Sequence, residues 1–340
     1  MADLSTRWLG FTLKSPLVVA ACPLANDVEA IAAAVDAGAG AVVMPSLFEE
    51  QLVQEQLAAH RFLDARTDVD AEARTFLPDV DVFSMGAEPY LVQLEKLRRR
   101  VDVPILASLN GSTPGGWTDY ARQLESRGAN AIELNLYDIA TSPTRSGADL
   151  EDQQLAIIRA VVSAVSLPVT VKICPFYSSV PAFVRRIEDA GARGVVVFNR
   201  FYQPDVDLDL LDVDRRLVLS TPLELPLRLH ALAILAPITG LSLACTGGVH
   251  SGRDAAKAIL CGAHVVQLAS ILLERGPAHV AAIREELDRW LCEKRYVSSA
   301  EARGVLARGP YPEPHAWERL NYVRVLDGWK PRTFGGVSHE

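Results

Sequence analysis

Eight short apolar runs recur along the chain, and amphipathic stretches separate most of them. The runs are often β-branched and are continuously apolar rather than alternating, which is typical of strands buried on both faces of a parallel sheet. They are Pro16–Ala21, Ala41–Met44, Pro104–Leu109, Ala131–Leu136, Pro168–Ile173, Gly194–Phe198, Leu241–Cys245 and Val265–Ala269. Eight strand–helix units in one chain favour an α/β fold of the closed TIM (β/α)8 barrel type over an open sheet.

The amphipathic stretches predict the helices of that barrel. They cover Val28–Ala37, Pro89–Val101, Gly116–Arg127, Leu150–Val165, Val180–Ala190 and Ser251–Leu260. Several are followed by a glycine, as at Gly38, Gly128 and Gly191, and glycine tolerates the left-handed backbone that ends a helix. An open dinucleotide-binding sheet would need G-x-G-x-x-G after its first strand, and the chain lacks that motif there.

Three segments lie outside the strand–helix units. Residues 46–88 form a long connection after the second predicted strand, too long for a bare barrel loop. Residues 199–226 follow the sixth strand and carry aspartates that alternate with apolar residues. Their spacing lacks the glycine and glutamate of a calcium-binding EF-hand loop and predicts an exposed hairpin instead. We predict one barrel domain over residues 1–305, with residues 306–340 as a tail packed on it.

Composition narrows the class of partner. The chain has 34 basic and 42 acidic side chains, a net charge of −8, which argues against binding to nucleic acid or to an anionic membrane surface. Five scattered cysteines without a Cys-x-x-Cys pair exclude a disulfide scaffold and a standard zinc or iron–sulfur site. No window holds about 20 uninterrupted apolar residues. We therefore predict a cytoplasmic protein that binds a small molecule and no metal.

The candidate chemistry lies where the predicted strands end, because barrels of this type carry their active sites there. The seventh strand is followed by Gly247 and Gly248, and the eighth ends at Ala269 and Ser270. Paired glycines let backbone N–H groups approach an anion, and the loops after strands seven and eight commonly hold phosphate. The sequence therefore predicts a phosphate site, with two ordinary tight turns as the alternative.

Three polar residues mark the other strand ends. Lys172 is a lone cation near the end of the fifth strand, and a buried lysine is costly unless it meets an anion or an electron-rich ring. Asn135 lies near the end of the fourth strand and Asn199 follows the sixth. Either amide could simply cap a loop. Two amides beside a lysine on one rim are instead typical of a site that recognises a planar heterocycle.

Several motifs together resemble the dihydroorotate dehydrogenase family over about residues 4–305. They are Pro16–Ala21, Ile132–Leu136, Pro168–Ile173, Thr246–Gly252 and Ala258–Gln267. The resemblance implies a barrel that holds FMN across its strand ends and oxidises a CH–CH bond, most simply dihydroorotate to orotate in pyrimidine biosynthesis, with hydride passing to flavin N5. It places Lys172 at the N1/O2 edge of the flavin, where it stabilises the negative charge of the reduced ring.

The same resemblance assigns the other site residues. Asn135 contacts both flavin and substrate, and Met85, Gly86 and Asn199 contact the substrate. The remaining flavin contacts fall on Ala21, Ser46, Ser108, Phe198, Gly247, Gly248, Ala269 and Ser270. The last four hold the FMN phosphate through their backbone.

The chain departs from the family at four substrate positions. A lysine is replaced by Pro45, and asparagines by Phe83 and Ala140. The family's catalytic base, a cysteine or serine, is replaced by Asp138, which we predict as the base, with Tyr137 as the alternative acid/base. A carboxylate is a weak base near neutral pH unless burial strengthens it. Each lost polar partner weakens orotate binding by about 1–3 kcal/mol if nothing replaces it.

These departures leave several functions open. Flavin binding is expected to be retained, with dihydroorotate, a related dihydropyrimidine or another enone-type compound as substrate. A flavin-free, phosphate-binding barrel enzyme and a non-catalytic flavin-binding protein are the alternatives. The electron acceptor, a separate electron-transfer partner and a homodimer also remain open.

Overall fold

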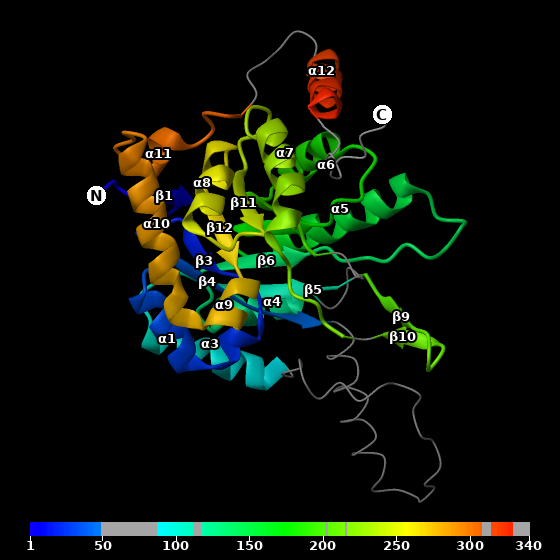
Figure 1. Cartoon of the computed structure of the whole chain (residues 1–340). Helices are drawn as coiled ribbons and strands as arrows, with labels where there is room; N and C mark the ends of the chain where they lie inside the picture. The colour runs from blue at the N-terminus through cyan, green and yellow to red at the C-terminus, as the bar shows by residue number, and fades with distance from the viewer. Residues whose placement is uncertain (49–86, 112–116, 201–202, 215, 308–313, 329–340) are drawn as a thin grey trace, which may run out of the picture. The chain divides into compact units, whose positions relative to one another are not determined.

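Eight parallel strands form a closed barrel (Figure 1). They are β3 (Leu17–Val19), β4 (Ala41–Phe48), β5 (Ile105–Asn110), β6 (Ala131–Asn135), β7 (Val169–Ile173), β8 (Gly194–Val197), β11 (Ser242–Thr246) and β12 (Val265–Leu268). The strands follow chain order around the barrel, and β12 closes it by pairing with β3. The predicted (β/α)8 barrel is therefore confirmed. The computed structural model describes residues 1–48, 87–111, 117–200, 203–214, 216–307 and 314–328.

Helices surround this barrel (Figure 1). Those expected from the sequence are α1 (Val28–Asp36), α3 (Ala87–Arg100), α4 (Trp117–Ser126), α5 (Gly147–Ala164), α6 (Val180–Asp189) and α8 (Gly252–Leu260). Side-chain caps define several of their starts; the Asp27 carboxylate, for example, accepts the N–H groups of Glu29 and Ala30. Gly38, Gly128 and Gly191 have φ of +111°, +94° and +92°, which confirms the predicted helix endings.

Several helices were not predicted. They are α7 (Leu225–Leu235), α9 (Ser270–Arg275), α10 (Val280–Glu293) and α11 (Ser299–Ala302), together with the 3₁₀ turns η1 (Pro23–Asn26), η2 (Pro222–Glu224) and η3 (Pro277–His279). Helix α7 buries residues on more than one side, including Ala231 and Ala233 as well as Leu232, so its sequence lacks the one-sided periodicity that marks an exposed helix. None of the helices in the described ranges is long and apolar enough to span a membrane.

Apolar side chains fill the N-terminal end of the barrel. A short antiparallel hairpin, β1 (Thr6–Trp8) with β2 (Phe11–Leu13), supplies Trp8, Leu9 and Leu13 to a cluster of inward-facing strand residues such as Val18 and Val43. The Leu9 N–H donates to Ser242 Oγ at the start of β11, so the hairpin lies at the N-terminal end of the barrel. A second, larger core packs between the strands and the helices. The hairpin closes one end, which leaves the C-terminal strand ends for ligands.

Two of the three segments outside the strand–helix units are described in part. Strands β9 (Asp205–Asp207) and β10 (Asp212–Asp214) pair antiparallel, with Val206 63% exposed, which confirms the predicted exposed hairpin after β8. The connection after β4 is also long, but residues 49–86 lie outside the described residues. The chain divides into two compact units, Met1–Ala307 and Arg308–Glu340, and the second contains helix α12 (Pro314–Asp327). Packing of residues 306–340 on the barrel stays a prediction.

His264 makes the stability of the barrel depend on pH. Its half-buried ring precedes β12, and Nδ1 accepts the N–H of Leu243 at 3.0 Å. Burial lowers the pKa of His264 from 6.5 to about 4. The unfolded chain therefore binds a proton between pH 6.5 and 4 that the native state does not bind, so stability is full above pH 6.5 and falls as the pH drops. The loss is on the order of 3 kcal/mol by pH 4 or below.

Urea denaturation of wild type and His264→Asn over pH 4–7 tests this prediction. The asparagine Oδ1 retains an acceptor for the Leu243 N–H but does not titrate. The variant is expected to show a flatter pH dependence in this window. Equal slopes for the two proteins would contradict the assignment.

Candidate active site

Two adjoining cavities lie at the C-terminal ends of the barrel strands. The first has a volume of about 270 Å³ and lies among the ends of β4, β5, β6 and β7; the second, about 240 Å³, reaches the ends of β11 and β12. Six residues line both cavities, namely Ala21, Cys22, Pro23, Lys172, Asn199 and Arg200. The two volumes therefore meet at Lys172 and together provide room for an elongated ligand.

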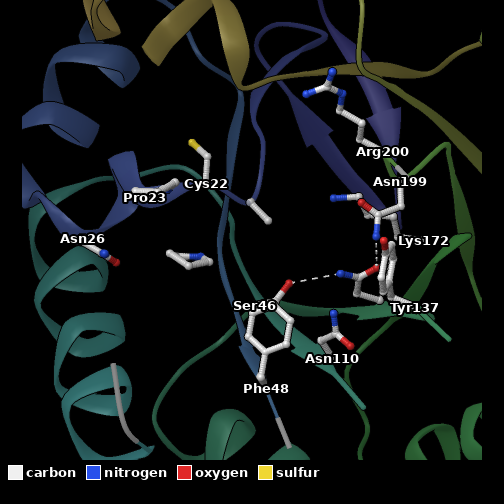
Figure 2. A pocket seen from close by; sticks show the side chains of 13 residues that line it. Cys22, Pro23, Asn26, Ser46, Phe48, Asn110, Tyr137, Lys172, Asn199 and Arg200 are labelled. Atoms are coloured by element: carbon white, nitrogen blue, oxygen red, sulfur yellow. Dashed lines mark hydrogen bonds between the residues drawn. The ribbon is translucent and has the colours of Figure 1, made fainter. Parts of the chain in front are cut away.

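A chain of hydrogen-bonded polar side chains forms one wall of the first cavity. Asn199 Nδ2 donates to Asn135 Oδ1 at 2.8 Å, and Asn135 Nδ2 donates to Ser46 Oγ at 3.4 Å (dashed lines in Figure 2). Ser46 Oγ in turn lies 2.8 Å from Oγ of the buried Ser108. These bonds fix which way each amide points, which is what recognition of a ring with ordered donors and acceptors requires. Asn110 also lines this cavity, although it was not predicted from the sequence.

Lys172 lies above a buried carboxylate. Its Nζ is 3.6 Å from Glu133 Oε1, and the Glu133 side chain is completely buried. Gln267 Nε2 donates to the other oxygen, Glu133 Oε2, at 2.7 Å. The expectation that a buried lysine must meet an anion is met within the protein by Glu133, which sequence analysis overlooked. A signal existed, because Glu133 precedes Asn135 by two residues and so points to the same inner face of the strand.

The residues of the predicted phosphate site line the second cavity. Gly247 and Gly248 line it with φ of +86° and +79°, beside Ala269 and Ser270. Ser270 Oγ lies 2.8 Å from Ser220 Oγ, and the Gly248 N–H donates to Ser220 Oγ at 3.4 Å. Sequence analysis missed Ser220, because it lies in the irregular segment that precedes η2. Two glycines with left-handed backbone and two serine hydroxyls thus lie in one cavity wall, an arrangement suited to a phosphate.

Two arginines support this region. Buried Arg228 donates from Nε to the Thr246 carbonyl at 2.9 Å, which fixes the turn that begins with Gly247. Glu224 lies between them, with Oε1 at 3.4 Å from Arg200 Nε and Oε2 at 3.5 Å from Arg228 Nη2. Burial lowers the pKa of Arg228 from its usual value. Arg200 follows Asn199 directly and adds a cation where the two cavities meet, a feature that sequence analysis missed.

The predicted base lies beside the site rather than in the cavity lining. Tyr137 lines the first cavity on the wall that holds Lys172 and Asn199 (Figure 2). Asp138 is 24% exposed, and its Oδ2 lies 3.9 Å from Arg145 Nη2. Ala140 is exposed, whereas Pro45 lines the first cavity. Met85, Gly86 and Phe83 lie outside the described residues, so their expected places at the substrate stay predictions.

The remaining predicted flavin residues gather around the two cavities. Ala21 lines both of them, and Ser46 and Phe198 each line one. The residues present fit FMN, because an anion cradle, a lysine and an ordered amide wall follow one another along the joined cavities. In that arrangement the cradle would hold the phosphate, and Lys172 and Asn135 would meet the ring.

A closed (β/α)8 barrel whose strand ends carry paired glycines beside a lysine-and-amide pocket fits the class of flavin-dependent oxidoreductases. The chain belongs to the dihydroorotate dehydrogenase family: the family model described as dihydroorotate dehydrogenase matches residues 3–291. The resemblance in the sequence motifs is thereby confirmed.

Relatives of known name support this membership. The chain is 26% identical over 319 residues to the catalytic subunit of dihydroorotate dehydrogenase B (NAD(+)) of Pyrococcus abyssi, which covers 89% of this chain and 98% of the relative. It is 30% identical over 197 residues to dihydroorotate dehydrogenase A (fumarate) of Lacticaseibacillus paracasei, covering 54% and 67%. It is 28% identical over 273 residues to the B-type catalytic subunit of Methanocella arvoryzae, covering 78% and 85%.

Proposed function

We propose that this protein is an FMN-dependent oxidoreductase that removes two hydrogens from a carbon–carbon single bond beside a carbonyl, with dihydroorotate as its substrate. The observation that carries the proposal is the meeting of the two cavities at Lys172. One cavity offers an anion cradle, and the other offers amide groups for a heterocycle. FMN, when bound, supplies the hydride acceptor for such an oxidation.

Different residues of this chain serve the phosphate, the flavin ring and the substrate. Gly247, Gly248 and Ser270 hold the phosphate, and the Lys172 ammonium offsets negative charge that develops on the ring. Asn135 and Asn199 orient a dihydropyrimidine through donors and acceptors that their mutual hydrogen bond holds in place. The pocket thus recognises a flat, polar ring.

Arg200 supports an anionic substrate. By resemblance, Pro45 occupies the position where the family usually has a lysine at the substrate. Arg200 lines the same cavity as Pro45 and offers a cation there. Its guanidinium is held by Glu224 at 3.4 Å and can meet a carboxylate. Because Pro45 offers no donor, a related dihydropyrimidine without the orotate carboxylate is the second candidate substrate.

Anaerobic addition of dihydroorotate to the purified protein tests the function. Bleaching of the visible flavin band is the expected result. The names of the two relatives carry different electron acceptors, NAD(+) and fumarate, so the experiment omits any acceptor. A colourless protein that takes up no FMN would contradict the proposal. A flavin band that persists with dihydroorotate but bleaches with another dihydropyrimidine would move the substrate to the second candidate.

We propose Asp138 as the base, since a carboxylate is already deprotonated at neutral pH and can take a proton from the substrate in the transition state, whereas a phenol such as that of Tyr137 still holds its own proton. Asp138→Asn is expected to slow flavin reduction by about 10²–10⁴-fold. Tyr137→Phe, the neighbouring control, is expected to slow it by less than about tenfold, and Asp138→Glu to recover part of the rate. Stopped-flow reduction measures all three. The reverse order of effects would move the role to Tyr137.

A further inference from the structure

Glu133 is a buried charge that the proposed chemistry does not use. Its side chain has no exposure, and its Oε1 has no hydrogen-bond partner among the described residues. A buried carboxylate costs several kcal/mol, and apolar residues of similar size commonly stabilise a core equally well or better. A purely structural role is therefore a weak account of a charge at this position.

The register places Glu133 directly beneath the site. Asn135 pairs with Lys172 across β6 and β7, and Glu133 pairs with Thr170, so Glu133 lies one inward-facing layer below the lysine. Gln267 reaches across the barrel from β12 to donate to Glu133 Oε2 at 2.7 Å. The carboxylate is held from one side by an amide and faces the ammonium on the other.

The geometry leaves the Lys172 ammonium free to meet a ligand in the cavities. At 3.6 Å, Nζ and Glu133 Oε1 form an ion pair that is longer than a hydrogen bond. The ammonium makes no hydrogen bond to a described residue, and Lys172 lines both cavities. Its N–H groups are therefore available to a ligand, while the carboxylate below holds the charge in place.

We propose that Glu133 and Gln267 are positioning residues that hold the Lys172 ammonium at the cavity floor and set the reduction potential of the bound flavin, which Glu133 lowers and Gln267 raises. This inference rests on the proposed function. Reduction of the flavin by two electrons with uptake of one proton leaves a negative charge on the ring, which Lys172 stabilises and Glu133 opposes. The amide of Gln267 reduces that opposition by drawing charge toward Oε2.

Three variants of the full chain test the pair. Glu133→Gln removes the opposing charge with little change in shape, and Gln267→Met leaves the carboxylate without its donor. Thr170→Val is the matched control, since its hydroxyl lies in the same layer, buried and without a hydrogen-bond partner among the described residues. FMN affinity is measured by fluorescence quenching. The potential is measured by dithionite titration against a reference dye.

The expected shifts have opposite signs. At a fixed potential, Glu133→Gln should raise the ratio of reduced to oxidised flavin about tenfold, which is about 30 mV for a two-electron couple. Gln267→Met should lower that ratio, and Thr170→Val should leave it unchanged. If each substitution only disturbed packing, the two variants would not shift the flavin potential in opposite directions. If one variant fails to fold, the sign of the other decides.

Two results would overturn the inference in distinguishable ways. Wild type that binds no FMN would remove the proposed function and this inference with it. Wild type that binds FMN, with unshifted or equally shifted potentials in the two variants, would remove the positioning role alone.

Discussion

Lys172→Met is expected to slow flavin reduction strongly and to destabilise the barrel at the same time. The ammonium is the group placed to stabilise charge on the ring, and loss of such a group costs about 10²–10³-fold in rate. The same change leaves Glu133 buried without its cation, because the carboxylate is fully enclosed and 3.6 Å from Nζ. Breaking a buried ion pair on one side costs about 3–5 kcal/mol.

The double variant Lys172→Met/Glu133→Gln separates these two effects. Neutralising both partners removes the unpaired charge, so most of the lost unfolding free energy should return while flavin reduction stays slow. Urea denaturation and stopped-flow reduction measure the two quantities on the same samples. Restored reduction in the double variant, or an unchanged stability in the single one, would contradict this account of the pair.

Gly248→Ala is expected to weaken FMN binding by about 10–100-fold, the loss of one hydrogen bond to a charged group. Gly248 has φ of +79°, which costs an alanine about 1–2 kcal/mol. Its Cβ would also lie 2.6 Å from the backbone N of Leu225. The turn would have to move away from α7, and its N–H groups would leave the cradle.

Gly10→Ala is the control for backbone strain. Gly10 has φ of +88°, and a Cβ there meets nothing within 4 Å, on the hairpin at the other end of the barrel. It should lose similar stability from strain and keep wild-type FMN affinity. Fluorescence titration of both variants with FMN decides the matter. Equal affinity in the two variants would remove the phosphate role of Gly248.

Local pattern was enough to predict the barrel. All eight predicted runs became its strands, because a strand buried on both faces is mostly apolar on both faces whatever its neighbours are. The exposed hairpin after β8 followed from its acid–apolar alternation. The pattern failed for α7, whose burial on more than one side hides helical periodicity, and for β1 and β2, which are too short to show a period.

The candidate site was foreseen in part for a similar reason. Parallel strands bring their carboxyl ends to one rim, so Asn135, Lys172 and Asn199 could be expected together from the sequence alone. Asn135 and Asn199 do meet, at 2.8 Å. The roles of Ser46 and Ser108 came from resemblance alone.

The sequence by itself determined the fold class, the family and the rim on which the chemistry lies, because these depend on periodicities and short motifs. Only the tertiary structure decided which buried polar groups meet. Glu133 and Gln267 are far apart in the chain, and Arg200 lies in an irregular segment and Glu224 in the short turn η2, whose paths no period predicts. Such pairs form because barrel closure sets distant strands and loops against one another, and a buried charge then requires a partner within a few ångströms.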